Sequence, residues 1–388
     1  MISFRFLTVF LLFYVPLILA VCSAVYYLAV CCASVLFRRE REQGNDFAPP
    51  VSVLKPVQGI EPSFYASLAS YFRQDYPAVE IVFGLSDPAG RDPAHWTIAQ
   101  LQRDFPRVAV KVVAVPDAAG VNPKMSKLQR MIEEAAHEIL VVTDADVRVE
   151  PGFLRRVVRP LADERVGMVT CLYRGVPAKQ FRSILEALGM SGDFAGQVLL
   201  ARLARGVRFA LGAAMVTRKK QIAEIGGIAL WAGYLADDYI LGRKIAEAGY
   251  RVHLSHTVVE TVLPDRTFSE MFRQQLRWAR TIRACSPRGY PGLLLAFGVP
   301  LALLACFIQP DSPPALAILV AVLFTRLLAA WVSGVLVCRD PVVAKYFWLL
   351  PLRDLLAFGV WVASFFGNEV IWRNARFRLE AGGKIKPA

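Results

Sequence analysis

The nine most informative residues of the sequence are Glu138-Ile139-Leu140-Val141-Val142-Thr143-Asp144-Ala145-Asp146. The apolar and β-branched run predicts a short buried strand over Glu138–Thr143. Two carboxylates, Asp144 and Asp146, follow at the point where that strand should end. This stretch therefore predicts both an element of a buried sheet and a candidate site at the carboxyl end of that element.

Segments of the same two kinds alternate on either side of this stretch. Strand-like runs lie at Val51–Lys55, Val79–Leu85 and Val108–Val115. Segments with helical spacing separate them, at Ser63–Phe72, Asp92–Phe105 and Lys124–Ala136. Strands that alternate with helices predict an α/β domain with a mostly parallel sheet covered on both faces. In open sheets of this kind, ligands bind beyond the carboxyl ends of the strands.

The N-terminal part of the chain is an apolar run, Phe6–Phe37, with no charged residue between Arg5 and Arg38. A helix needs about 20 apolar residues to cross a bilayer, so the run is long enough. A cleaved signal peptide is the alternative, but its apolar region is about 7–15 residues long. We therefore expect an uncleaved anchor. The arginines directly after it predict that the following domain is cytoplasmic.

Three apolar segments follow Pro291, namely Gly292–Ile308, Ala315–Val337 and Tyr346–Trp372. We expect the first two to span the membrane. The third contains Pro351-Leu352-Arg353-Asp354, and charges at the centre of a bilayer are costly. We therefore expect a broken hairpin or an interfacial segment there. The basic C-terminal tail favours the cytoplasmic side.

The net charge of +13 arises from 45 Lys and Arg against 32 Asp and Glu. Basic residues beside membrane segments mark the cytoplasmic side and favour contact with anionic headgroups. The sequence has no basic face with aromatic platforms and no nucleic-acid-binding motif, so we expect no nucleic-acid partner. Its seven cysteines contain no Cys-x-x-Cys pair, which argues against a zinc framework or a disulfide scaffold. The sequence gives no indication of an oligomeric state.

Two acidic clusters could carry chemistry. Asp144 and Asp146 could share a Mg²⁺ or Mn²⁺ ion, which takes oxygen ligands and bridges phosphate oxygens. A simple turn at the strand end is the alternative. Asp237-Asp238-Tyr239 opens the helical run Ile240–Ala248. One of these aspartates could act as a base that removes a proton from an acceptor hydroxyl, or as a second ligand. The alternative is an acidic first turn that stabilises the helix.

Two further groups are candidates for ligand binding. Asp87 and Asp92 follow the strand Val79–Leu85, where a carboxylate could accept hydrogen bonds from a nucleoside; ordinary loop chemistry is the alternative. Arg277 and Trp278 lie in a segment with arginines at helical spacing. These arginines favour an amphipathic helix on a membrane surface. Alternatively, Arg277 and Trp278 face a site, with Arg277 offsetting diphosphate charge and Trp278 forming a wall.

Taken together, the ordered motifs resemble the ceramide glucosyltransferase family, over roughly residues 50–290. The motifs are Lys55–Pro62, Gln74–Pro77, Asp92–Ala94, Gly120–Lys124, Thr143–Asp146, Asp237–Tyr239 and Gln274–Trp278. Thr170–Gly175 and Leu276–Arg283 look similar to a bacterial branch that includes hopanoid-biosynthesis glycosyltransferases.

The resemblance implies a GT-A-type nucleotide-binding fold and an inverting transfer from a UDP-sugar with Mg²⁺ or Mn²⁺. It implies that the nucleotide is bound by Asp87, Asp92, Lys124 and Asp144. Asp144 and Asp146 would bind the metal, and Asp238 would be the general base. Gln274, Arg277 and Trp278 would form the acceptor and diphosphate end. Animal ceramide enzymes lack the second acid of the Asp-x-Asp pair, so Asp146 matters less than Asp144 under this interpretation.

We therefore expect four parts: a membrane anchor with a basic flank at 1–44, a cytoplasmic GT-A domain at 45–288, membrane segments at 289–372 and a basic tail at 373–388. The expected protein is an integral enzyme of a bacterial inner membrane. Its expected substrates are UDP-N-acetylglucosamine and a hopanoid polyol such as bacteriohopanetetrol. The alternatives are a ceramide glucosyltransferase that uses UDP-glucose, a polysaccharide synthase, and a non-catalytic lipid-binding membrane protein.

Overall fold

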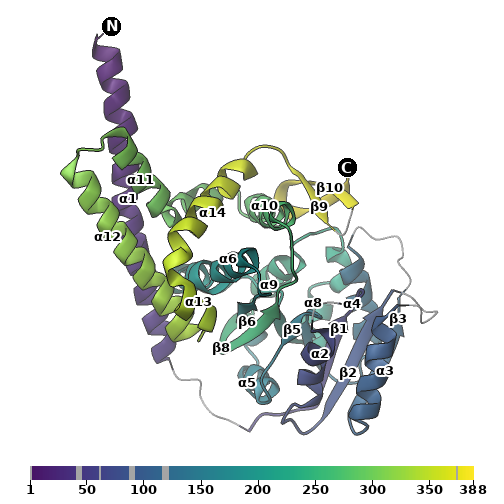
Figure 1. Ribbon diagram of the computed structural model, residues 1–388. Coiled ribbons are helices and arrows are strands. Elements are labelled where there is room, and N and C mark those ends of the chain that lie inside the picture. Colours follow the sequence, from purple (N-terminus) through teal and green to yellow (C-terminus); the bar gives the residue numbers. More distant parts are fainter. Residues whose placement is uncertain (1, 41–45, 61–62, 87–91, 116–121, 373–374) are drawn as a thin grey trace. The chain divides into compact units, whose positions relative to one another are not determined.

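The β-branched runs form strands at the predicted positions in the computed structural model (Figure 1). The structure describes residues 2–40, 46–60, 63–86, 92–115, 122–372 and 375–388. The chain divides into two units. The sheet unit comprises Arg41–Ala178, Gly206–Asp265 and Gly383–Ala388. The membrane-segment unit comprises Met1–Glu40, Lys179–Arg205 and Arg266–Gly382.

The first half of the sheet unit is parallel, as predicted. Strand β1 pairs in parallel with β2 on one side and β4 on the other, and β2 pairs in parallel with β3. The helices α2, α3 and α4 connect these strands. The bounds are β1 Val51–Pro56, α2 Phe64–Phe72, β2 Val79–Leu85, α3 Ala94–Asp104, β3 Ala109–Ala114, α4 Pro123–Glu134 and β4 Ile139–Thr143.

The second half makes the sheet mixed. The order of the eight strands is β3-β2-β1-β4-β7-β6-β8-β5. Strand β7 pairs antiparallel with both β4 and β6, while β6 and β8 run parallel and β5 pairs antiparallel with β8. The bounds are β5 Val147–Arg148, α5 Phe153–Val158, η1 Arg159–Ala162, β6 Val166–Val176, β7 Ala214–Arg218, α8 Lys219–Glu224, η3 Ile228–Trp231, α9 Asp237–Glu247, β8 Arg251–Val262 and β11 Ile385–Pro387.

Alternate residues of the central strands enter two separate cores. In β4, Ile139 and Val141 pack with α2 and α5 residues such as Leu68 and Phe153. Leu140 and Val142 enter the second core, which includes residues of α4 and α9. Alternation is expected because successive side chains of a strand point to opposite faces. The prediction of a sheet covered on both faces is thus confirmed.

The membrane-segment unit is mainly helical, and α11 and α12 pack along α1 (Figure 1). Helix α10 packs against α14. The bounds are α1 Ile2–Arg39, α6 Phe181–Gly189, η2 Met190–Phe194, α7 Ala195–Arg205, α10 Phe268–Cys285, η4 Tyr290–Ala296, α11 Gly298–Ile308, α12 Pro313–Ala330, η5 Trp331–Val337, α13 Pro341–Tyr346, η6 Phe347–Leu349, α14 Leu350–Ser364, β9 Glu369–Trp372, β10 Ala375–Leu379 and η7 Ala381–Gly383.

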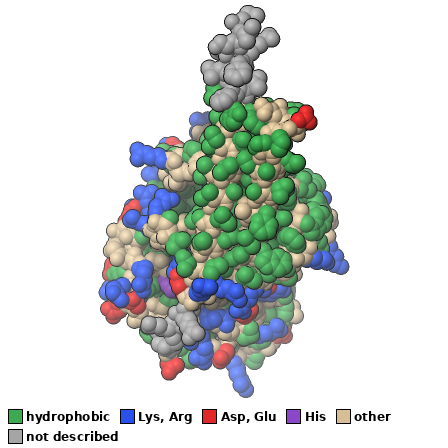
Figure 2. Space-filling view, turned by 90° about the vertical axis from the view of Figure 1, so that its left-hand side faces the viewer, with side chains coloured by type: hydrophobic (Ala, Val, Ile, Leu, Met, Phe, Trp, Pro, Cys, Tyr) green, Lys and Arg blue, Asp and Glu red, His purple; other side chains and the backbone are tan. Residues whose placement is uncertain are grey.

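Within the described residues, three helical stretches are long and apolar enough to cross a membrane: Leu11–Arg39, Pro313–Val337 and Pro341–Ser364. The segment Gly292–Ile308, which we expected to span the membrane, bends by 68° between η4 and α11, as in a broken span or a re-entrant loop. Figure 2 shows a broad apolar face of the molecule. Exposed apolar residues of the spans include Ile18, Val25 and Phe324.

The third apolar segment differs from the sequence interpretation. Pro351 does not break the helix, because it lies in the first turn of α14, where its fixed φ suits a helix start. The apolar helix ends at Ser364, and Glu369–Trp372 is a strand rather than the end of a span. Asp354 forms a buried ion pair with Arg326 of α12, so its charge is neutralised inside the protein.

Candidate functional site

The Asp144-Ala145-Asp146 turn begins where β4 ends, and backbone hydrogen bonds fix both of its ends. The Val147 amide donates to the Asp144 carbonyl at 3.3 Å, and the Val262 amide donates to the Asp146 carbonyl at 3.0 Å. The second bond ties the turn to β8, and β5 then pairs with the same strand. Both aspartates are half-buried. The turn therefore presents two carboxylates at the carboxyl end of a central strand.

Lys124 faces this turn from the first residues of α4. Asn122 caps the helix, because its side chain accepts from the amides of Lys124 and Met125. The Lys124 ammonium lies 2.7 Å from Asp144 Oδ1 and 3.5 Å from Asp237 Oδ2. Burial lowers the pKa of Lys124, but the Asp144 and Asp237 carboxylates outweigh this effect and hold its pKa above the ordinary value. Lys124 is thus a charged link between α4, the turn and α9.

Asp237 and Asp238 occupy the first turn of α9. Asp238 Oδ1 accepts a hydrogen bond from the Tyr239 amide at 2.7 Å. Gly212 faces this carboxylate, since a Cβ at Gly212 would lie 2.9 Å from Asp238 Oδ2. Burial and the neighbouring Asp237 charge raise the pKa of Asp238 to about 6, although Lys124 opposes the rise. A carboxylate with such a pKa can accept a proton near neutral pH.

The turn offers few but suitable oxygen ligands for a divalent cation. Among the described residues, no group of three or more His, Cys, Asp or Glu side chains could hold a metal ion. Mg²⁺ is commonly bound through one or two carboxylates and completes its shell with substrate phosphates and water. Asp144 and Asp146 could supply the one or two carboxylates of such a magnesium site. In the ligand-free structure Asp144 Oδ1 contacts the Lys124 ammonium.

Of the two acids predicted to bind the nucleotide after β2, Asp92 lies within the described residues and Asp87 does not. Asp92 is half-buried and its Oδ1 accepts from the Ala94 amide at 2.9 Å, at the start of α3. Asp92 thus binds a backbone amide at the N-terminus of α3, and its binding of a nucleotide stays a prediction. Asp87 lies outside the described residues, as do Gly120 and Val121 of the motif before Asn122.

Arg277, Arg280 and Arg283 recur at helical spacing along α10, and these arginines make two kinds of contact. Arg280 donates to the backbone carbonyls of Phe366 and Glu369, and Arg283 donates to that of Gly367 at 2.7 Å. These contacts hold the end of α14 and the start of β9. Arg277 instead donates to Gln274 Oε1 at 3.3 Å, and Trp278 is 37% exposed. Arg277 thus contacts Gln274, whereas Arg280 and Arg283 bind the following segment.

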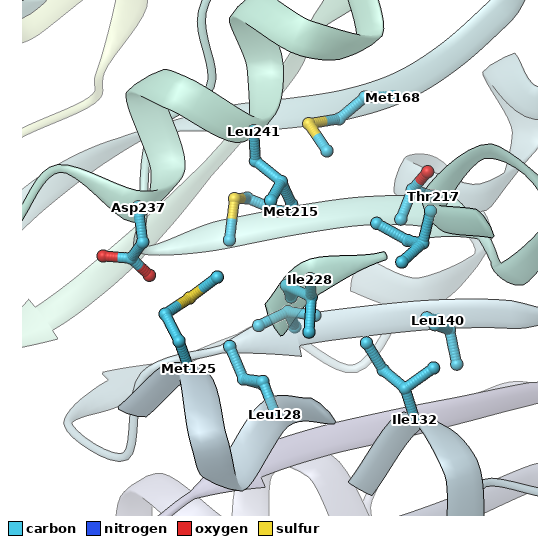
Figure 3. A pocket seen from close by; sticks show the side chains of 12 residues that line it. Met125, Leu128, Ile132, Leu140, Met168, Met215, Thr217, Ile228, Asp237 and Leu241 are labelled. Carbon is cyan, nitrogen blue, oxygen red and sulfur yellow. The ribbon is translucent and has the colours of Figure 1, made fainter. Parts of the chain in front are cut away.

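A small pocket in the sheet unit has one acidic residue, Asp237, in its lining (Figure 3). Its lining is apolar apart from Thr217 and Asp237, and it contains three methionines, Met125, Met168 and Met215. In Figure 3 Asp237 lies at one end of the group, beside Met125. Apolar pockets of this kind do not suit a charged nucleotide. We therefore place the candidate site at the acidic residues and not in this pocket.

Sequence reasoning missed one buried lysine beside the site. Lys55 of β1 is fully buried, and its Nζ donates to the Asp144 carbonyl at 2.8 Å. Burial lowers the pKa of Lys55 well below its ordinary value, although Asp146 and Asp144 oppose the shift. The available signal was a lysine in an otherwise apolar strand, Val51-Ser52-Val53-Leu54-Lys55. Such a residue needs a buried partner.

Comparisons with known proteins agree with this description. A family model described as glycosyl transferase family 21 matches residues 15–385. The chain is 25% identical over 353 residues to ceramide glucosyltransferase 3 of Caenorhabditis elegans, covering 87% of this chain and 74% of that protein. It is 29% identical over 158 residues to a ceramide glucosyltransferase of Gibberella zeae, covering 39% of this chain and 30% of that protein.

One solved structure with a similar fold is the mannosyltransferase PcManGT from Pyrobaculum calidifontis, in complex with GDP-Man and Mn²⁺. The TM-score is 0.50 at 19% sequence identity, and the match covers 90% of this chain and 99% of that chain. At this identity the likeness concerns the fold. It confirms the predicted GT-A-type α/β fold with a mostly parallel sheet.

Proposed function

The chain belongs to glycosyl transferase family 21, and from this premise we propose that it transfers a sugar from a UDP-sugar to a hydroxyl of a membrane lipid. The family match and the ceramide glucosyltransferase relatives identify a glycosyltransferase that acts on a lipid. The candidate membrane helices agree with a membrane protein. The UDP donor, the inverting course and the cytoplasmic position of the sheet unit in a bacterial inner membrane are part of the proposal.

The observation that supports it most is the placement of Lys124 among the carboxylates of Asp144, Asp237 and Asp238 at the end of β4. Asp238 would take the proton of the acceptor hydroxyl as the oxygen bonds to the anomeric carbon and the bond to UDP breaks. Its raised pKa suits this role, because a base works best with a pKa near the operating pH. Lys124 would lie where it can neutralise diphosphate charge.

Asp144 and Asp146 would hold Mg²⁺ or Mn²⁺, which would supply charge stabilisation for the leaving diphosphate. Gln274, Arg277 and Trp278 would bind the acceptor and diphosphate, and Asp87 and Asp92 the nucleoside. For Arg277 this role is compatible with its contact to Gln274, because a guanidinium carries five N–H donors.

The preferred substrate pair is UDP-N-acetylglucosamine and a hopanoid polyol, because Thr170–Gly175 and Leu276–Arg283 look similar to the bacterial branch. A second candidate is UDP-glucose with ceramide, which the names of the relatives favour.

The test uses the full chain in nanodiscs with Mn²⁺ and the four pairings of these donors and acceptors, with products identified by mass spectrometry. An N-acetylhexosamine on bacteriohopanetetrol supports the first pair, and a hexose on ceramide supports the second. Absence of any lipid product together with absence of UDP binding would refute the proposed function. The Asp238→Asn protein serves as the control for contaminating activity.

A further inference from the structure

Lys55 lies inside the sheet unit at the end of β1, with no exposed surface. Its neighbours on the strand are apolar, and Val51 and Val53 pack in the core that also contains Tyr71. The Lys55 ammonium lies 3.6 Å from the centre of the Tyr71 ring. A lysine is rarely buried completely, because removal of its charge or its N–H groups from water is costly unless a partner compensates.

The polar partner of Lys55 is the backbone of the acidic turn. Its Nζ donates to the Asp144 carbonyl at 2.8 Å, across 89 residues of sequence. The same carbonyl accepts from the Val147 amide at 3.3 Å. A carbonyl oxygen has two lone pairs, so Lys55 and Val147 together satisfy it. One of these bonds closes the turn locally, and the other attaches it to a different strand.

Lys55 and Lys124 contact different parts of Asp144. Lys124 binds the Asp144 side chain, whereas Lys55 binds the Asp144 main chain. Loss of Lys124 would thus change the charge around the carboxylates. Loss of Lys55 would instead release the backbone from which the carboxylates project. A hydrogen bond to a carbonyl needs only an N–H donor, so the contact does not depend on the protonation state of Lys55.

We propose that Lys55 is a positioning residue for the Asp144-Ala145-Asp146 turn. It holds the Asp144 carbonyl from within the sheet and so fixes the direction in which both carboxylates leave the turn. The part of this inference that concerns cation and nucleotide binding rests on the proposed function, but the anchoring of the turn does not.

A second buried lysine provides a matched control. Lys127 of α4 is 2% exposed and its Nζ donates to the Val57 carbonyl at 2.8 Å. Lys55→Met and Lys127→Met therefore each remove a buried ammonium and a 2.8 Å hydrogen bond to a backbone carbonyl. Lys55 donates to the acidic turn, whereas Lys127 donates to Val57.

The first test is hydrogen exchange of the ligand-free full chain, read at the Val147 amide, which donates to the same carbonyl. We expect exchange to be about tenfold faster in Lys55→Met, and within about twofold of wild type in Lys127→Met, because local exchange reports local opening. Equal exchange of this amide in the two variants would overturn the proposal. Should Lys55→Met not fold, Lys55→Gln, which keeps a donor one atom short of Nζ, should show an intermediate rate, and a wild-type rate with it would overturn the proposal.

The second test measures UDP affinity with and without Mn²⁺. Lys55→Met should weaken UDP binding about tenfold when Mn²⁺ is present, with a smaller change in its absence, since the carboxylates act through the cation. Lys127→Met should show similar affinities to wild type. If wild type itself failed to bind UDP, the proposed function would fail while the exchange result still decided the role of Lys55.

Discussion

Two groups of charged side chains in this molecule are arranged in opposite ways. In the membrane-segment unit, Arg326 and Asp354 are 3% and 2% exposed. Arg326 Nε and Nη2 contact the two oxygens of Asp354 at 2.7 and 2.8 Å, and Nη1 donates to the Gly192 carbonyl at 2.8 Å. One guanidinium binds both oxygens of one carboxylate, and each of its nitrogens has a partner. The nearby Asp193 carboxylate pairs with Arg353 at 3.4 Å, so the charges of this group balance.

In the sheet unit the charges do not balance. Lys124 contacts Asp144 and Asp237, and Asp238 raises the number of nearby carboxylates to three. The side chain of Asp144 is 40% exposed. A group with excess negative charge that opens to solvent suits a ligand that brings positive charge, whereas a closed and balanced pair suits a structural role. We therefore assign a structural role to the balanced pair and propose that the unbalanced group performs the chemistry.

The largest effect is expected for Asp238→Asn. Loss of the base should lower kcat by about 10²–10⁴-fold, because the amide cannot take the acceptor proton. UDP affinity should stay within a few-fold of wild type, as measured by calorimetry in parallel with turnover. Asp163→Asn is the control, since Asp163 pairs with Arg165 and Arg251 at the surface of the same unit. A fully active Asp238→Asn protein would remove Asp238 from the mechanism.

Substitutions in the Arg326–Asp354 pair should change the stability of the protein. Arg326→Met leaves Asp354 buried without its cation and should lower the free energy of unfolding by about 3–5 kcal/mol. The double variant Arg326→Leu/Asp354→Leu should recover most of this loss, because two apolar residues remove both charges together. Unfolding of the detergent-solubilised protein by heat measures both. If the double variant were less stable than Arg326→Met, the pair would contribute more than mutual neutralisation.

The pH dependence should distinguish the unbalanced group. A base must be deprotonated, so kcat/KM should fall as the pH drops through about 6, the pKa of Asp238. In Lys124→Met this acidic limb should shift to higher pH, because Lys124 lowers the pKa of Asp238. The shift is measured from pH profiles of the two proteins at saturating Mn²⁺. An unmoved limb would mean that Lys124 does not act on the titrating group.

The smallest effect is expected along α10. Arg280→Gln loses the hydrogen bonds to Phe366 and Glu369 and should reduce stability by about 1 kcal/mol, with kcat nearly unchanged. Arg277→Gln should do the reverse, with a lower kcat and little change in stability. Thermal unfolding and turnover of both variants provide the comparison. Equal kcat values for the two variants would show that Arg277 and Arg280 do not differ in their contribution to turnover.

Several features followed from local sequence pattern. The strands β1, β2, β3 and β4 begin and end within one or two residues of the apolar runs that predicted them. The helices between them follow the predicted segments in the same way. The acidic turn after β4 was also correctly placed. Such features depend on residues close in sequence, whose period of two or 3.6 is visible without the fold.

Other features could not be read from local pattern. The bend between Ala296 and Gly298 was not predicted, nor was the strand Glu369–Trp372 at the end of the third apolar segment. Hydropathy measures only how apolar a segment is, and a bent segment has the same composition as a straight one. The mixed second half of the sheet was equally invisible, because strand order depends on contacts between distant residues.

The sequence by itself determined the α/β alternation, the apolar spans, the acidic turn and the family resemblance, since these depend on composition, period and ordered motifs. Only the tertiary structure decided the partners of the buried charges. Lys55 lies 89 residues from Asp144, and Arg326 lies 28 residues from Asp354. The partner of a buried charge must lie within hydrogen-bond distance in space, and chain folding, not local sequence, brings the two together.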